Sequence, residues 1–275
     1  MTLTPEQKFL YTRIAILLAT AGWLTSAYAG FQGARYWYGG FVLCFWIAFG
    51  LLNYKEGTSL YLARRRTVVF LAFYAALVAT MYLADQLGLR LFLWYYPYYG
   101  ALGYTWLYLV LYPAMAFSLI EFLYFVGARL GAALSFVTPP PGRMHLLIDR
   151  LESVVFLLMM GLIVLGAAGN QVSLPLVALV TVLWILLALV KLRLHVRHSG
   201  HYLLAVLFAV LLATVLNEYQ NLIAREWVYL PHAALEPVLS VSVMRLPLWI
   251  WLGWFWLTLV PLRLWIFLVL HPKVR

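Results

Sequence analysis

Long apolar stretches separated by short polar gaps dominate the pattern along this chain of 275 residues. A helix needs about 20 mostly apolar residues to cross the hydrocarbon core, because unpaired backbone groups are too costly there. The pattern predicts about eight crossings, and therefore an all-α, polytopic helical bundle. They cover approximately 9–29, 38–53, 67–87, 103–126, 151–168, 174–190, 202–222 and 246–270.

Aromatic residues collect near the ends of two of these stretches. The apolar run 89–131 is long enough for two crossings, but Pro97 and Gly100 interrupt it inside a series of Trp and Tyr residues. Such clusters favour the headgroup region, so we place residues 91–100 at the interface and count one crossing after them. We assign the tryptophans near one end of the last helix to an interfacial belt as well: Trp249, Trp251, Trp254 and Trp256.

The charged residues predict the orientation. Only 10% of the residues are charged and 65% are hydrophobic, whereas a soluble domain has about 25% charged residues. With the N-terminus inside, fourteen of the 19 Lys and Arg residues fall in inner segments and four in outer segments. This bias follows the positive-inside rule, so we predict that both termini face the cytoplasm, in a bacterial inner membrane. It also explains the net charge of +10 without a nucleic-acid partner.

The whole chain, 1–275, is predicted to be one membrane domain. The first four helices cover about 9–128, a Pro-rich cytoplasmic loop covers 129–150, and the last four helices cover 151–270. The six histidines all fall in loops or at helix ends, and the loop that carries three of them is basic, which repels a cation. We therefore predict no metal site and no cofactor.

The strongest candidate for chemistry is a polar stripe at the end of the seventh predicted helix. Thr214, Glu218, Asn221 and Arg225 are spaced by four, three and four residues, which puts them on one helical face. As catalytic candidates, Glu218 would be an acid or base and Arg225 a clamp for an anionic group, with Asn221 between them. The alternative is a polar helix end that binds neighbouring helices and anchors the outer loop.

A second candidate lies deeper in the predicted membrane. Glu121 precedes the inner end of its helix by about two turns, at a depth similar to that of Arg263. An unpaired carboxylate there would be costly, so we expect an intramembrane ion pair between Glu121 and Arg263 or Arg13. Such a pair would be an ion or proton site, or a structural link between helices.

These patterns leave three hypotheses for function and do not decide whether the protein is an enzyme. The first is a non-catalytic accessory or scaffold subunit, with other membrane subunits as its partners. The second is an enzyme or binding protein for a membrane lipid or isoprenoid, with its site near the outer face. The third, a small-solute transporter, agrees less well with the few polar groups at mid-membrane.

Overall fold

A computed structural model describes residues 4–33, 37–54, 58–129, 143–195, 199–230, 232 and 241–270. The described chain is mostly helical, which confirms the all-α fold class. The helices are α1 (Pro5–Gln32), α2 (Trp37–Leu52), α3 (Ser59–Arg65), α4 (Thr67–Arg90), α5 (Ala101–Trp106), the π-helical turn η1 (Leu107–Leu111), α6 (Tyr112–Arg129), α7 (Arg143–Ala167), α8 (Leu174–His195), α9 (Ser199–Ala224), α11 (Leu248–Trp265) and the π-helical turn η2 (Ile266–Leu270).

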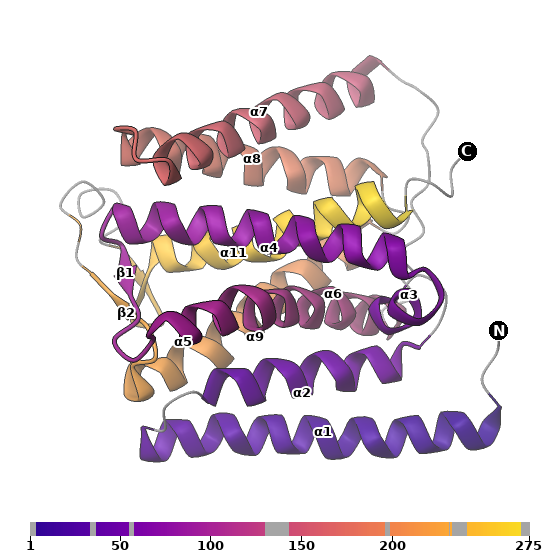
Figure 1. The fold of residues 1–275 in the computed structure, drawn as a ribbon. Helices are drawn as coiled ribbons and strands as arrows, with labels where there is room; N and C mark the ends of the chain where they lie inside the picture. The colour runs from indigo at the N-terminus through magenta and orange to yellow at the C-terminus, as the bar shows by residue number, and fades with distance from the viewer. Residues whose placement is uncertain are drawn as a thin grey trace.

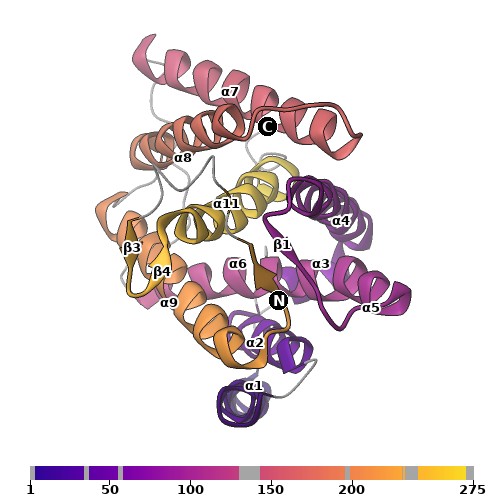
Figure 2. The same cartoon turned by 90° about the vertical axis from the view of Figure 1, so that its left-hand side faces the viewer.

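The helices form a layered bundle, shown from the side in Figure 1 and from one end in Figure 2. The α7–α8 pair covers α4 and α11, α6 and α9 lie in the middle, and α2 and α1 form the opposite side. Within the described residues, seven helical segments are long and apolar enough to cross a membrane, and α2 is a shorter apolar helix. The start of α1 and the end of η2 lie at the same end of the bundle.

Burial differs between the middle and the outside of the bundle. Phe117 and Leu123 of α6 have no exposed surface, whereas Leu17 of α1, Leu157 of α7 and Leu179 of α8 are largely exposed. A soluble protein rarely presents such a continuous apolar exterior. The outer faces of α1, α7 and α8 are therefore suited to contact lipid chains.

Two helix starts show how the sequence sets boundaries. Thr4 and Gln7 cap the start of α1 reciprocally, since each side chain accepts a hydrogen bond from the other residue's backbone N–H. The prediction that 143–150 belongs to a loop is wrong: α7 begins at Arg143, because no Pro or Gly interrupts those polar turns. The remainder of that predicted loop, 130–142, and residues 196–198 of the histidine-rich loop lie outside the described residues.

Proline 113 explains the π-helical turn between α5 and α6. Proline has no N–H to donate to the carbonyl four residues earlier, which is that of Leu109. The hydroxyl of Tyr74 on α4 donates to this carbonyl instead. The helix continues through the irregular turn, and Tyr104, Tyr108 and Tyr112 stack along one side of it.

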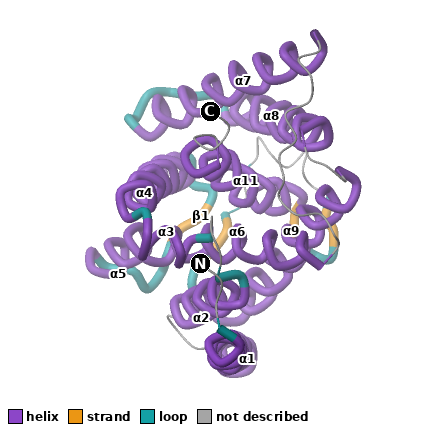
Figure 3. Tube along the Cα trace, turned by 90° about the vertical axis from the view of Figure 1, so that its right-hand side faces the viewer, coloured by secondary structure: helices purple, strands orange, loops and turns teal. Residues whose placement is uncertain are grey.

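Two short antiparallel ribbons close one end of the bundle, where Figure 3 colours them orange among purple helices. In the first, β1 (Trp94–Tyr95) pairs with β2 (Val228–Tyr229), so that Trp94 lies opposite Tyr229. In the second, β3 (Ser242–Val243) pairs with β4 (Leu246–Pro247). The first ribbon joins the predicted interfacial segment to the chain that follows α9.

Candidate functional site

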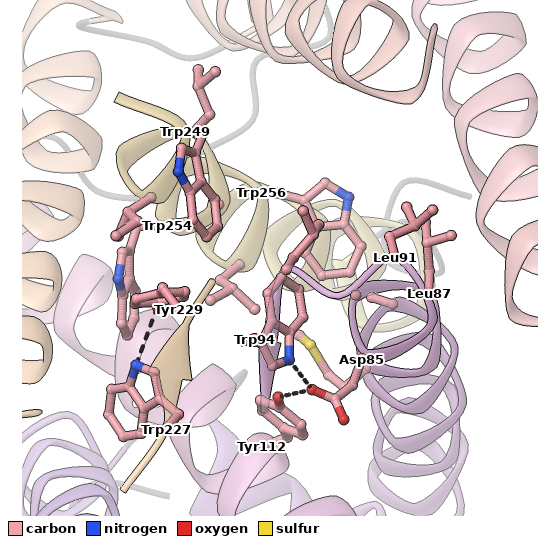
Figure 4. A pocket seen from close by; sticks show the side chains of 18 of the residues that line it. Asp85, Leu87, Leu91, Trp94, Tyr112, Trp227, Tyr229, Trp249, Trp254 and Trp256 are labelled. Carbon is pink, nitrogen blue, oxygen red and sulfur yellow. Dashed lines mark hydrogen bonds between the residues drawn. The ribbon is translucent and has the colours of Figure 1, made fainter. Parts of the chain in front are cut away.

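A half-open cavity of about 260 Å³ lies between α4, α8, α11 and the β1–β2 ribbon. Its walls are mainly apolar and aromatic, as the close view in Figure 4 shows. Two carboxyl groups line it, those of Asp85 and Glu218, and the described residues that line it include no Lys, Arg or His. Five tryptophans contribute to the walls: Trp94, Trp227, Trp249, Trp254 and Trp256.

Asp85 is buried, with only 2% of its surface exposed, and its carboxyl group has four uncharged hydrogen-bond partners. Its Oδ1 lies 2.9 Å from Trp94 Nε1, 2.7 Å from the Tyr96 hydroxyl and 2.8 Å from the Tyr112 hydroxyl. The Tyr108 hydroxyl donates to Oδ2 at 2.6 Å. Tyr108 and Tyr112 reach the same carboxyl group because they are four residues apart on one helical face.

Trp94 depends on a glycine for its position. A Cβ atom at Gly88 would lie only 2.1 Å from the Trp94 ring, so any other residue there would push the ring away. The ring therefore lies directly against the backbone of α4, where its N–H reaches Asp85 one helical turn earlier. Figure 4 shows this N–H and the Tyr112 hydroxyl both directed at Asp85.

Glu218 is the second buried carboxyl group of the cavity, at 1% exposure. Its Oε1 accepts hydrogen bonds from the Tyr229 hydroxyl at 2.7 Å and from Trp254 Nε1 at 2.8 Å. Trp227 Nε1 donates to Oε2 at the longer distance of 3.4 Å. Since Tyr229 lies opposite Trp94 in the ribbon, one pair of facing residues holds both carboxyl groups.

The three catalytic candidates of the predicted polar stripe, Glu218, Asn221 and Arg225, separate in the structure. Glu218 lines the cavity. Asn221 is buried and holds Trp227, donating from Nδ2 to its carbonyl at 2.7 Å and accepting its N–H at 3.1 Å. Arg225 follows the end of α9 with a positive φ of 54°, and its side chain is exposed and does not line the cavity. The predicted common face therefore ends before Arg225.

Glu226 is a fully buried carboxyl group behind the cavity wall. It accepts a hydrogen bond from the Tyr99 hydroxyl and one from the backbone N–H of Tyr38 at 3.3 Å. Tyr38 lies in the first turn of α2, where a negative charge is favourable. Burial raises the pKa of Glu226, and these hydrogen bonds lower it by less. Its contacts fix Tyr38 and Tyr99, both of which line the cavity.

The predicted ion pair of Glu121 with Arg263 or Arg13 is wrong. Arg263 Nε lies 2.6 Å from Glu152 on α7, because α7 rather than α6 presents a carboxylate beside that part of α11. The guanidinium of Arg13 is exposed and lies 4.1 Å from the centroid of the Phe9 ring. Lys191 Nζ, at 2.9 Å, is the second cation beside Glu152.

Glu121 itself is fully buried and is satisfied by polar groups around the α2–α3 connection. Its carboxylate accepts hydrogen bonds from Asn53 Nδ2 at 3.1 Å and from the backbone N–H and hydroxyl of Ser59, at 2.6 and 2.5 Å. It is thus held at the start of a short helix, α3, which the sequence did not predict.

Sequence reasoning missed Asp85, and it misassigned part of the tryptophan series. An isolated acidic residue inside a predicted crossing was the available signal for Asp85, and the same signal applied to Glu152. Trp249, Trp254 and Trp256 line the cavity rather than only forming an interfacial belt. Spacing along one helix could not show that the segment 91–100 would supply the opposite wall.

No cluster of three or more His, Cys, Asp or Glu side chains suited to a metal ion occurs in the described ranges. The carboxyl groups that line the cavity are engaged by phenol and indole groups, which suits an organic ligand better than a metal ion. Comparisons with protein families, with characterised proteins and with solved structures found no match to this chain.

Proposed function

We propose that this protein is a membrane-embedded enzyme or binding protein for a molecule of the lipid or isoprenoid class, held in the aromatic cavity. The observation that carries the proposal is one cavity that combines Trp and Tyr walls with the carboxyl groups of Asp85 and Glu218. Ligand sites are typically concave, mainly apolar and equipped with a few polar groups that fix orientation. The volume of about 260 Å³ approaches that of small-molecule sites, roughly 300–1,000 Å³.

The charge of the walls limits the ligand. The described lining residues carry no basic group that would bind a phosphate or carboxylate, and Arg225 lies elsewhere. An anionic headgroup would also meet two acidic side chains. The part of the ligand inside the cavity is therefore uncharged or positively charged, which favours a neutral isoprenoid or lipid over a phosphorylated one.

The cavity distinguishes this proposal from the other two hypotheses. An accessory or scaffold subunit needs no hollow lined by buried acidic groups, since unfilled space and buried polar groups both reduce stability. A transporter is expected to bind its substrate near mid-membrane. This cavity instead lies toward the end of the bundle that carries the β1–β2 ribbon.

The same end is the proposed outer face. With eight crossings, α2 included, the basic residues Lys8, Arg64, Arg129 and Lys191 belong to the opposite end of the bundle. The positive-inside rule then supports both termini in the cytoplasm and a location in a bacterial inner membrane. The cavity would be reached from the outer leaflet.

Filling the cavity tests the proposed function. Gly253 lines it on α11, and a Cβ at this position would meet nothing within 4 Å. We expect Gly253→Leu to fit into the hollow and to displace the ligand. The wild-type protein and the variant are purified in mild detergent, and the neutral lipids that accompany each are quantified by mass spectrometry.

Gly161→Leu provides a matched control, because Gly161 is also an exposed glycine inside an apolar helix with no atom within 4 Å of an added Cβ. It lies on α7 and does not line the cavity. A neutral lipid retained by wild type and Gly161→Leu but lost from Gly253→Leu would support the proposal. Equal retention in all three proteins, or no retained ligand in any, would contradict it.

A further inference from the structure

Three oxygen atoms on the cavity wall lie in mutual contact. Oδ1 of Asp85 is 2.7 Å from the Tyr96 hydroxyl and 2.8 Å from the Tyr112 hydroxyl. The two hydroxyls are themselves 2.6 Å apart. All three separations are those of O–H···O hydrogen bonds, so each requires a proton between its two oxygens.

The two phenols supply only two protons for these three contacts, since a tyrosine hydroxyl carries one hydrogen. If Asp85 were ionised, one pair of oxygens would face each other at close range without a hydrogen. A protonated carboxyl group supplies the third proton and completes the triangle. Tyr108 does not change this count, because its proton goes to Oδ2, the other carboxyl oxygen.

We infer that Asp85 is a neutral carboxylic acid that shares its proton with Tyr96 and Tyr112, and that this cluster is the proton donor of the cavity. The inference deepens the proposed function and, in its donor role, rests on it. The substrate class that it indicates is an uncharged, apolar molecule with a group that can accept a proton.

The chemistry of the step is balanced without an oxidant or reductant. The O–H bond of Asp85 breaks, and the proton bonds to the acceptor atom of the ligand. The ligand becomes a cation and Asp85 a carboxylate, which still accepts the hydrogen bonds of Trp94 and Tyr108. The faces of aromatic rings stabilise a positive charge, and Glu218 adds a second acidic group on the same cavity.

Infrared spectroscopy tests the resting state without any ligand. We expect wild-type protein at neutral pH to show the C=O stretching band of a neutral carboxylic acid, displaced when water is replaced by D2O. The difference spectrum of wild type minus Asp85→Asn should contain this band, because the subtraction removes every neutral carboxyl group that the two proteins share, and Glu218→Gln should keep the same component. A wild-type spectrum without the band, or a difference spectrum of wild type minus Asp85→Asn without it, overturns the inference and leaves the lipid co-purification result unaffected.

A second pair of variants keeps the test valid if Asp85→Asn does not fold. Tyr112→Phe removes two contacts of the triangle and one proton, so the proton shortage disappears and the neutral-acid band should weaken. Tyr108→Phe removes one phenol without altering the triangle, and the band should persist at full intensity. Equal band intensity in the two variants contradicts the proton count.

The donor role is tested with N,N-dimethyl-4-hexylaniline, an apolar weak base that is neutral in neutral buffer and loses its ultraviolet band when protonated. We expect wild-type protein to protonate this probe and Asp85→Asn to leave it neutral. A probe that stays neutral in the presence of the wild-type protein overturns the donor role.

Discussion

Glu152 and Glu218 are both buried acidic residues inside the bundle, at 1% exposure each, but their neighbours differ in kind. Glu152 lies between two cations, Lys191 at 2.9 Å and Arg263 at 2.6 Å, and Trp184 completes its hydrogen bonding. The side-chain donors that hold Glu218 are the indole and phenol groups of Trp227, Tyr229 and Trp254, and Glu218 faces a cavity. The first group therefore links α7, α8 and α11, and the second is available to a ligand.

This difference separates structural from functional acidic groups in a membrane protein. A carboxylate placed between cations cannot change its charge without leaving those cations uncompensated. A carboxyl group held by neutral donors keeps its hydrogen bonds whether it is ionised or protonated. Asp85 resembles Glu218 in this respect, so the cavity has two acidic groups whose charge can respond to a ligand.

The largest expected effect is on stability and compares the two glutamates directly. Glu152→Gln keeps the shape of the side chain but removes the counter-charge of Arg263 and leaves Lys191 with only Asp149, at 3.4 Å. Breaking a buried pair costs about 3–5 kcal/mol, and the partial exposure of both cations reduces this to about 2–3 kcal/mol of unfolding free energy. Glu218→Gln should cost about 1 kcal/mol, since neutral hydrogen bonds are largely replaced.

Reversible unfolding in mixed detergent micelles measures both variants under identical conditions. Retained ligand is measured in the same preparations, and here we expect the opposite order, with Glu218→Gln losing more ligand than Glu152→Gln. If Glu218→Gln proves the more destabilising change while ligand retention is unaffected, the distinction between the two sites fails.

The sequence predicted the helices far better than the site, for a physical reason. Apolar length and periodicity are local properties, and they located the long helices found in the described residues. The partners of Arg263 and Asp85 depend on which helices become neighbours, and no spacing along the chain contains that information. Depth in the membrane suggested Glu121 as the partner of Arg263, yet Glu152 on α7 has the contact.

The polar stripe shows the same limit at finer scale. Helical spacing correctly put Glu218 and Asn221 on a buried face of α9. It failed at Arg225, because the helix ends at Ala224 and the next residue adopts a positive φ. The position of a helix end depends on the Asn221–Trp227 contacts, which form only after the chain has turned back.

A smaller effect is expected from Asn221→Ala, which would loosen the donors around Glu218 without touching the carboxyl group. The variant loses two hydrogen bonds to Trp227, at a cost of about 2 kcal/mol. Asn217→Ala is the matched control: Asn217 is equally buried on α9 but makes one local bond to the Ala213 carbonyl, worth about 1 kcal/mol. Ligand retention should fall in Asn221→Ala and persist in Asn217→Ala; equal retention would show that Trp227 does not need this anchor.

The smallest expected effect concerns Glu226, which lies outside the crossing segments and has a neutral-donor environment like that of Glu218. Because burial raises its pKa above the ordinary value of 4.5, the unfolded state ionises first as the pH rises. Its stabilising contribution is therefore full below about 4.5 and is lost as the pH rises through the folded-state pKa. The midpoint temperature of thermal unfolding of the wild-type protein should therefore fall as the pH rises through that window.

Glu226→Gln should flatten this dependence of the midpoint temperature on pH. Glu6→Gln, at an exposed position in the first turn of α1, is the control and should leave the slope as in wild type. A slope unchanged by Glu226→Gln would mean that the pKa of Glu226 is the same in the folded and unfolded states, which would contradict a buried environment of neutral donors.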